Sequence, residues 1–241
     1  GLDAENLTVD RVEPVRYPRP AMWSRHPLGA PAMLMVSLAL AGCPRSGSVP
    51  SGADPEKYSR AEYDLAQDEW RHGRLRSAMD HAQKASEADP GHAESHHFVG
   101  LLYLALCQTE GDCRFEEAER YVRRAISADD EYRPAKHTLG VVLIQRKRYA
   151  DAVAVLRPLA EDILYKTPEL AWYDLGGAYL ELGDLERAGD ALSRALALRP
   201  TFCWANYRLG LVQERRGALD RAEQEFSRAV APEDPTCRNL Q

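Results

Sequence analysis

The stretch ELAWYDLGGAYLELGDLERAGDALSRALALRPTF, residues 169–202, decides the fold of this 241-residue chain. It is typical of two helices joined by a turn at Gly183, with a proline that ends the unit. Small, aromatic and leucine residues lie at fixed positions of both helices: Trp172, Leu175, Gly176, Tyr179, Ala188, Leu192 and Ala195, followed by Pro200. Because small residues let two helices approach closely, we expect these positions to form a tightly packed core.

The same pattern occurs five times, at a spacing near 34 residues. The copies are aligned by one small residue of the first helix, which is in turn Ala66, Gly100, Gly140, Gly176 and Gly210. The separations are 34, 40, 36 and 34 residues. The turn between the helices is marked by Gly73, Gly183 and Gly217, and Lys147 takes that place in the third copy. The chain is therefore predicted to be a repeat protein.

This pattern resembles the tetratricopeptide repeat family, whose unit reads W-x2-L-G-x2-Y, then A-x3-F-x2-A, then P. The resemblance implies an all-α fold, a right-handed superhelical solenoid of about five antiparallel helix pairs. The tetratricopeptide domain is assigned to residues 56–241, with repeats at about 59–92, 93–132, 133–168, 169–202 and 203–236. Helical structure is expected to begin near Asp54 and Pro55, where a capping carboxylate precedes a proline.

An apolar run from Leu28 to Gly42 precedes the repeats and follows Arg25 and His26. It is shorter than the roughly 20 residues that a transmembrane helix needs, and its charged start and small-residue end are typical of a secretory signal. Residues 22–42 are therefore predicted to be a signal peptide that starts at Met22. Residues 1–21 are predicted to be an over-extended or disordered N-terminus.

The residues that end this run, Leu40, Ala41, Gly42 and Cys43, resemble the bacterial lipobox. The resemblance implies that Cys43 is lipidated and becomes the N-terminus, followed by a flexible tether over residues 43–55. Pro44 is not the aspartate associated with inner-membrane retention, which implies an outer-membrane anchor and a periplasmic repeat domain. The alternative is a buried cysteine at the end of a core helix, but no periodic polar face continues past Cys43.

The number of cysteines agrees with export of the chain to an oxidising compartment. The chain has five cysteines, and lipidation of Cys43 leaves an even set, which favours disulfides in an oxidising compartment. Cys107 and Cys113 flank the extra residues of the second repeat, and Cys203 and Cys237 flank the helix pair of the fifth. We expect a disulfide within each pair, and the alternative is four free thiols.

Charge and motifs exclude several function classes. The formal net charge is −6 and the pI is about 5.7, so no broad basic field is available for nucleic acid. No glycine-rich phosphate loop and no nucleophile signature occurs, so we predict no enzyme activity, no cofactor and no small-molecule substrate. His92, His96 and His97 could share a metal by spacing, but no cysteine or carboxylate at matching spacing completes the ligand set, and no metal is predicted.

The resemblance also assigns the inner wall of the superhelix to fixed positions of the first helices. Position five holds Tyr63, His97, His137, Tyr173 and Tyr207. Position nine holds Gln67, Leu101, Val141, Gly177 and Leu211, and position twelve holds Trp70, Leu104, Ile144, Leu180 and Glu214. The aromatic and apolar members predict a groove that binds an apolar segment of a protein partner. The alternative is that neighbouring helices cover this stripe as core.

Size, lipobox, short tether and continuous repeats together resemble the type IV pilus pilotins, the group known as PilF, PilW or Tgl. The resemblance implies that the partner is the outer-membrane secretin subunit. It also implies a role in secretin insertion and oligomerisation, and thereby in pilus biogenesis and motility. The alternative is a lipoprotein scaffold of another envelope complex, for outer-membrane protein insertion or peptidoglycan synthesis.

Overall fold

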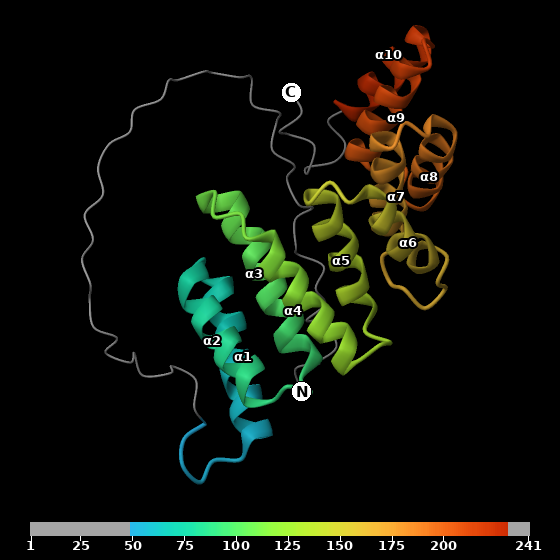
Figure 1. The fold of residues 1–241 in the computed structure, drawn as a ribbon. Coiled ribbons are helices and arrows are strands. Elements are labelled where there is room, and N and C mark those ends of the chain that lie inside the picture. The colour runs from blue at the N-terminus through green and yellow to red at the C-terminus, as the bar shows by residue number, and fades with distance from the viewer. Residues whose placement is uncertain (1–48, 231–241) are drawn as a thin grey trace, which may run out of the picture.

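The computed structural model describes residues 49–230, which form ten helices in five antiparallel pairs (Figure 1). The first helices of the pairs are α1 (Pro55–Arg71), α3 (Ala93–Glu110), α5 (Arg133–Gln145), α7 (Pro168–Glu181) and α9 (Cys203–Arg215). The second helices are α2 (Leu75–Ala88), α4 (Phe115–Ala128), α6 (Tyr149–Ala160), α8 (Leu185–Leu198) and α10 (Leu219–Ala229). The predicted all-α solenoid of helix pairs is confirmed.

Each helix packs on the helices before and after it in the chain, and the first helices α3, α5, α7 and α9 also contact one another in succession. Figure 1 shows the pairs stacked from α1 and α2 at one end to α9 and α10 at the other. No single pair encloses a core, so the apolar residues of one pair are buried by the next. The first helices from α3 to α9 therefore form one wall of the stack.

Two of the aligned small residues show why the helices lie so close. A Cβ atom on Gly100 of α3 would lie 2.4 Å from Cγ2 of Val122 on α4. A Cβ atom on Gly140 of α5 would lie 2.4 Å from Cδ2 of Leu156 on α6. Only a residue without a side chain fits at such contacts, so the spacing of these glycines sets the spacing of the helices.

The helix ends follow local sequence. Asp54 caps α1, because its carboxylate accepts a hydrogen bond from the backbone N–H of Glu56 at 3.1 Å, and Pro55 takes the first helical position. Lys147 has a φ of 58° in the turn between α5 and α6. This is the conformation that Gly183 adopts in the equivalent turn, so the predicted replacement of glycine by Lys147 is confirmed.

The turns that link one repeat to the next share one geometry. In three of them an aspartate, Asp89, Asp129 or Asp162, accepts a hydrogen bond at 2.8–2.9 Å from the N–H two residues later. In all four, the backbone N–H of an aromatic residue or histidine closes the turn, and these residues are His92, Tyr132, Tyr165 and Phe202. This turn brings a ring back over the helices at each repeat boundary.

The second repeat is the enlarged one, and α3 is the longest helix described, at 18 residues. A disulfide joins Cys107 near its end to Cys113 in the following turn, with Cα atoms 4.2 Å apart. Cys203 is buried at the start of α9. Its predicted partner Cys237, the predicted signal peptide and the predicted lipobox with Cys43 lie outside the described residues.

Candidate binding surface

The wall of first helices is organised by ring stacking between its position-five residues and the rings of the inter-repeat turns. The ring of Tyr63 lies 5.1 Å from that of His92, and the ring of His97 lies 5.3 Å from that of Tyr132. The other two contacts are His137–Tyr165 at 5.9 Å and Tyr173–Phe202 at 4.8 Å. Each of the first four repeats therefore covers its own position-five residue with the last ring of the same repeat.

This covering corrects the predicted groove. Six of its twelve residues are buried and belong to the core or to buried contacts: His97, Leu104, Val141, Ile144, Tyr173 and Leu180. Positions nine and twelve were expected to form an open aliphatic stripe, but four of their residues are buried: Leu104, Val141, Ile144 and Leu180. The alternative of a covered core is correct for these residues, because stacked repeats need this area to bury their faces.

The accessible part of the wall is smaller and lies toward its two ends. Tyr63, Trp70 and Leu101 are half-buried at the N-terminal end, and the half-buried Leu211 and the 39% exposed Tyr207 lie at the C-terminal end. His137 is half-buried between them. The surface that could contact a partner is therefore two apolar patches separated by a mostly covered middle.

Buried polar groups link the middle first helices. His97 Nε2 lies 2.8 Å from Thr138 Oγ1, and His137 Nε2 lies 3.0 Å from Asp174 Oδ2. Burial lowers the pKa of His97 to about 3, with a smaller effect from His137, so its imidazole is neutral at physiological pH. A neutral ring can accept one hydrogen bond and donate another, as its contacts with Thr138 and Tyr132 require.

At the C-terminal end, Arg208 of α9 reaches back to α7. Its guanidinium donates to the backbone oxygen of Tyr173 at 3.0 Å and lies 4.0 Å from the centroid of the Tyr173 ring. A Cβ atom on Gly177 would lie 2.0 Å from this guanidinium. The missing side chain at Gly177, a position-nine residue, therefore makes the space for a cation over the Tyr173 ring of α7.

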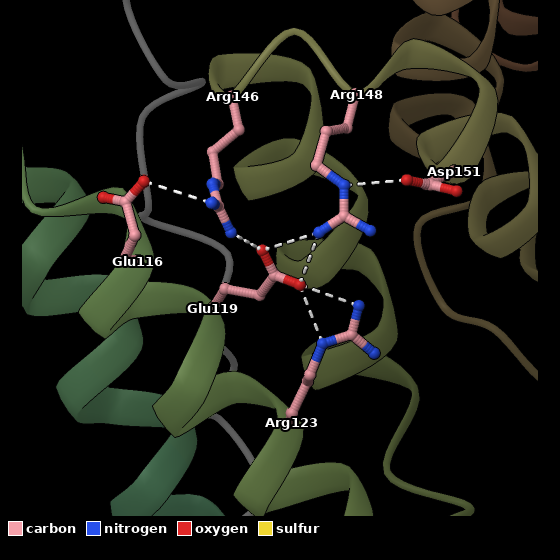
Figure 2. Close-up of polar contacts among 6 residues, drawn as sticks. All are labelled: Glu116, Glu119, Arg123, Arg146, Arg148 and Asp151. Carbon is pink, nitrogen blue, oxygen red and sulfur yellow. Dashed lines mark hydrogen bonds and ion pairs between the residues drawn. The ribbon is translucent and has the colours of Figure 1, made fainter.

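A second polar cluster joins the outer helices of repeats two and three. Figure 2 shows Glu119 of α4 pointing into the turn between α5 and α6, between the side chains of Arg146 and Arg148. Its carboxylate also accepts a hydrogen bond from Arg123 at 2.8 Å. Burial alone would raise the pKa of Glu119, but bonds from Arg123 and Arg146 hold it below its usual value. The buried carboxylate therefore joins α4 to the turn between α5 and α6, and the arginines do not form a free basic patch. We call Glu119 and its three arginines the Glu119 lock.

The three histidines considered as metal ligands each have a different hydrogen-bond partner. His92 Nδ1 lies 3.0 Å from Ser59 Oγ, His96 Nε2 lies 3.2 Å from the oxygen of Pro90, and His97 contacts Thr138. Within residues 49–230, no three His, Cys, Asp or Glu side chains are placed to hold a metal ion. No helix in the same part of the chain is long and apolar enough to cross a membrane.

Comparison with known proteins finds tetratricopeptide-repeat proteins similar to this chain. Residues 171–230 match the family model described as TPR repeat. The chain is 24% identical over 177 residues to the type IV pilus assembly protein PilF of Pseudomonas aeruginosa strain PAO1. That alignment covers 70% of this chain and 66% of PilF, slightly less than two thirds of the relative. Human tetratricopeptide repeat protein 16 is 26% identical over 167 residues, and only 18% of it is covered.

Solved structures agree on the architecture. The crystal structure of PilW, a widely conserved type IV pilus biogenesis factor, superposes with a TM-score of 0.64 at 24% identity, covering 71% of this chain and 76% of PilW. MamA of Desulfovibrio magneticus RS-1 superposes with a TM-score of 0.62 at 21% identity, covering 74% and 94%. These likenesses show the fold.

Residues 171–230 thus match a tetratricopeptide repeat, and the described residues have the fold of tetratricopeptide-repeat proteins. The sequence of the chain is similar, at low identity, to the type IV pilus assembly protein PilF, and its fold is similar to that of PilW.

Proposed function

We propose that this chain is a lipid-anchored scaffold that assists assembly and outer-membrane insertion of the type IV pilus secretin. The proposal rests on two features that occur together in this chain. The repeats are similar to a type IV pilus assembly protein, and the sequence before them contains Leu40–Cys43, which resembles a bacterial lipobox. A repeat protein with no catalytic signature and an expected membrane anchor is suited to hold a partner at the membrane and not to transform it.

In the proposed mechanism, the lipid on Cys43 confines the solenoid to a thin layer at the outer membrane, facing the periplasm. Confinement raises the effective concentration of chain and secretin subunit, so weak contacts become sufficient. The accessible wall residues contribute those contacts: Leu101 and Trp70 at one end, and Tyr207 and Leu211 at the other. Two separated apolar patches fit an extended apolar segment that spans the wall better than a single short helix.

The test is a strain that lacks the gene, complemented with variants and assayed for heat-stable secretin multimers and for palmitate on the chain. The wild type should restore both, and Cys43→Ala should remove palmitate and reduce multimers. Equal multimers with and without the gene would refute the secretin role. Palmitate absent from the wild-type chain would refute the anchor separately.

A further inference from the structure

Two large apolar side chains project into solvent from the turn between α6 and α7. Ile163 is 95% exposed and Leu164 is 67% exposed. Single exposed apolar residues are common on protein surfaces, but two adjacent ones at the tip of one turn form a concentrated apolar knob. We use that name, the Ile163–Leu164 knob, for these two residues.

The backbone of the knob is fixed. Asp162 accepts hydrogen bonds from the N–H of Leu164 at 2.8 Å and, through its backbone oxygen, from the N–H of Tyr165 at 3.1 Å. Arg133 of α5 donates to the Asp162 carboxylate at 2.6 Å, and the buried Tyr165 ring stacks on His137. The knob therefore lies on a turn held at both ends, so little conformational entropy is lost when it is bound.

The other inter-repeat turns show that folding does not require apolar residues here. Residues 129–132 read Asp-Asp-Glu-Tyr and residues 162–165 read Asp-Ile-Leu-Tyr, and both turns carry the same two hydrogen bonds. The two central residues are Pro90 and Gly91 in the first turn and Pro200 and Thr201 in the fourth. Only the third turn places two large apolar side chains at these solvent-facing positions, and it does so without burying them.

The charges around the knob favour a protein over a lipid surface. The exposed acids on this turn and the neighbouring one are Asp129, Asp130, Glu131 and Glu161, and the bases near them are the exposed Lys166 and the half-buried Lys136, whose charge acts on Asp162. Arg133 lies between the two turns and is already paired with Glu131 at 3.2 Å and with Asp162. An acidic edge is repelled by anionic headgroups but complements a basic rim.

We propose that the Ile163–Leu164 knob is a docking element that inserts into an apolar pocket, rimmed by Lys or Arg, on a partner protein other than a second copy of this chain. The proposal is independent of the pilus assignment, because it specifies the chemistry of the pocket and not the identity of the partner. The knob also lies outside the wall patches, so the chain can hold two contacts at once.

The chain itself supplies the matched variant. The double substitution I163D/L164E gives residues 162–165 the sequence that residues 129–132 already fold into the same turn. We expect its melting temperature to equal that of the wild type within about 2 °C, the shift typical of a surface change. A clearly lower melting temperature would show that the two side chains stabilise the fold, and would overturn the proposal.

Binding is tested with the full chain in its native cells. The photo-crosslinking amino acid p-benzoylphenylalanine replaces Leu164, and in a control it replaces Thr201 at the equivalent position of the next turn. The expected result is a crosslink from position 164 to an apolar peptide flanked by Lys or Arg in another protein. We expect at least about tenfold less product when Ile163→Asp is added, as for a central binding residue. Crosslinks to lipid, to a second copy, equally from position 201, or to nothing would each overturn the proposal.

Discussion

The guanidinium of Arg208 occupies the space over α7 that a side chain at Gly177 would fill, with a hypothetical Cβ atom only 2.0 Å away. The contact is unlike that of Gly140, whose missing side chain is replaced by the branched end of Leu156 inside the core. A long arginine side chain can move aside, whereas a packed leucine between two helices cannot. Two glycines at equally close contacts are therefore expected to differ in their tolerance of a methyl group.

Gly140→Ala should destabilise the fold by about 2 kcal/mol, because the added methyl overpacks the contact between α5 and α6. Gly177→Ala should change the free energy of unfolding by less than about 1 kcal/mol, since the helix propensity gained offsets the displaced Arg208. Urea denaturation of both variants measures the difference. Equal stability of the two variants would contradict the assignment of Gly140 as a spacing residue.

His97 makes stability depend on mild acid. The unfolded chain takes up a proton at this side chain near its usual pKa of 6.5, but the folded chain does so only near pH 3. The stabilisation from neutral His97 is therefore complete above about pH 6.5 and declines as the pH falls toward 3. At about 1.4 kcal/mol per pH unit, the wild type should lose about 2 kcal/mol between pH 7 and pH 5 from this group.

His97→Gln should show a smaller loss of unfolding free energy over the same range, because glutamine does not titrate. The exposed His72→Gln is the control and should follow the wild type. Denaturation midpoints at pH 7, 6 and 5 give the comparison. If the stability of His97→Gln depends on pH as that of the wild type does, protonation of His97 does not cause the loss.

Glu119→Gln should destabilise the fold by about 2 kcal/mol at pH 7. The variant leaves three arginines without their shared carboxylate, and the cost is below that of a fully buried pair because the arginines are partly solvated. Glu116→Gln removes an exposed partner of Arg146 and should cost less than about 0.5 kcal/mol. Because the folded pKa of Glu119 is lowered, this stabilisation is fully present above its unfolded pKa and is lost as the pH falls through the folded pKa. Equal effects of the two substitutions would show that Glu119 is not a lock.

The disulfide between Cys107 and Cys113 closes a short loop at the end of α3. Replacing both cysteines with serine should lower the free energy of unfolding by about 2 kcal/mol, the value that loop entropy gives for such a length. Thermal melts with and without reductant provide the measurement. Reductant should lower the melting temperature of the wild type more than that of the variant, and an equal response would contradict a structural role.

The solenoid could be predicted because the residues that set helix packing lie within each repeat. They are the small residues at 100, 140, 176 and 210 and the turn residue Lys147. The sequence did not predict which wall residues stay accessible. The rings that cover Tyr63, His97, His137 and Tyr173 come from the inter-repeat turns, about 30 residues later in the chain. Their signal was present, as an aromatic residue or histidine three places after Asp89, Asp129, Asp162 and Arg199, but only the folded stack shows what these rings contact.

The Glu119 lock was missed for a related reason. A carboxylate on the second helix of repeat two and two arginines in the turn of repeat three are separated by 27 and 29 residues. Each appears as ordinary surface charge when its own helix is considered alone. Only the stacking of repeats brings them together and removes the carboxylate from water.

The most direct test of the account is the affinity of the purified chain for the purified secretin subunit, measured by calorimetry with a matched pair of variants. Leu101→Asp combined with Leu211→Asp places charge in both wall patches. Leu198→Asp, at the 53% exposed end of α8, places the same charge outside the wall. We expect the wild type and Leu198→Asp to bind alike, and the double variant to bind at least about tenfold more weakly while it remains folded by circular dichroism. Equal binding by all three proteins, or no binding by the wild type, would contradict it.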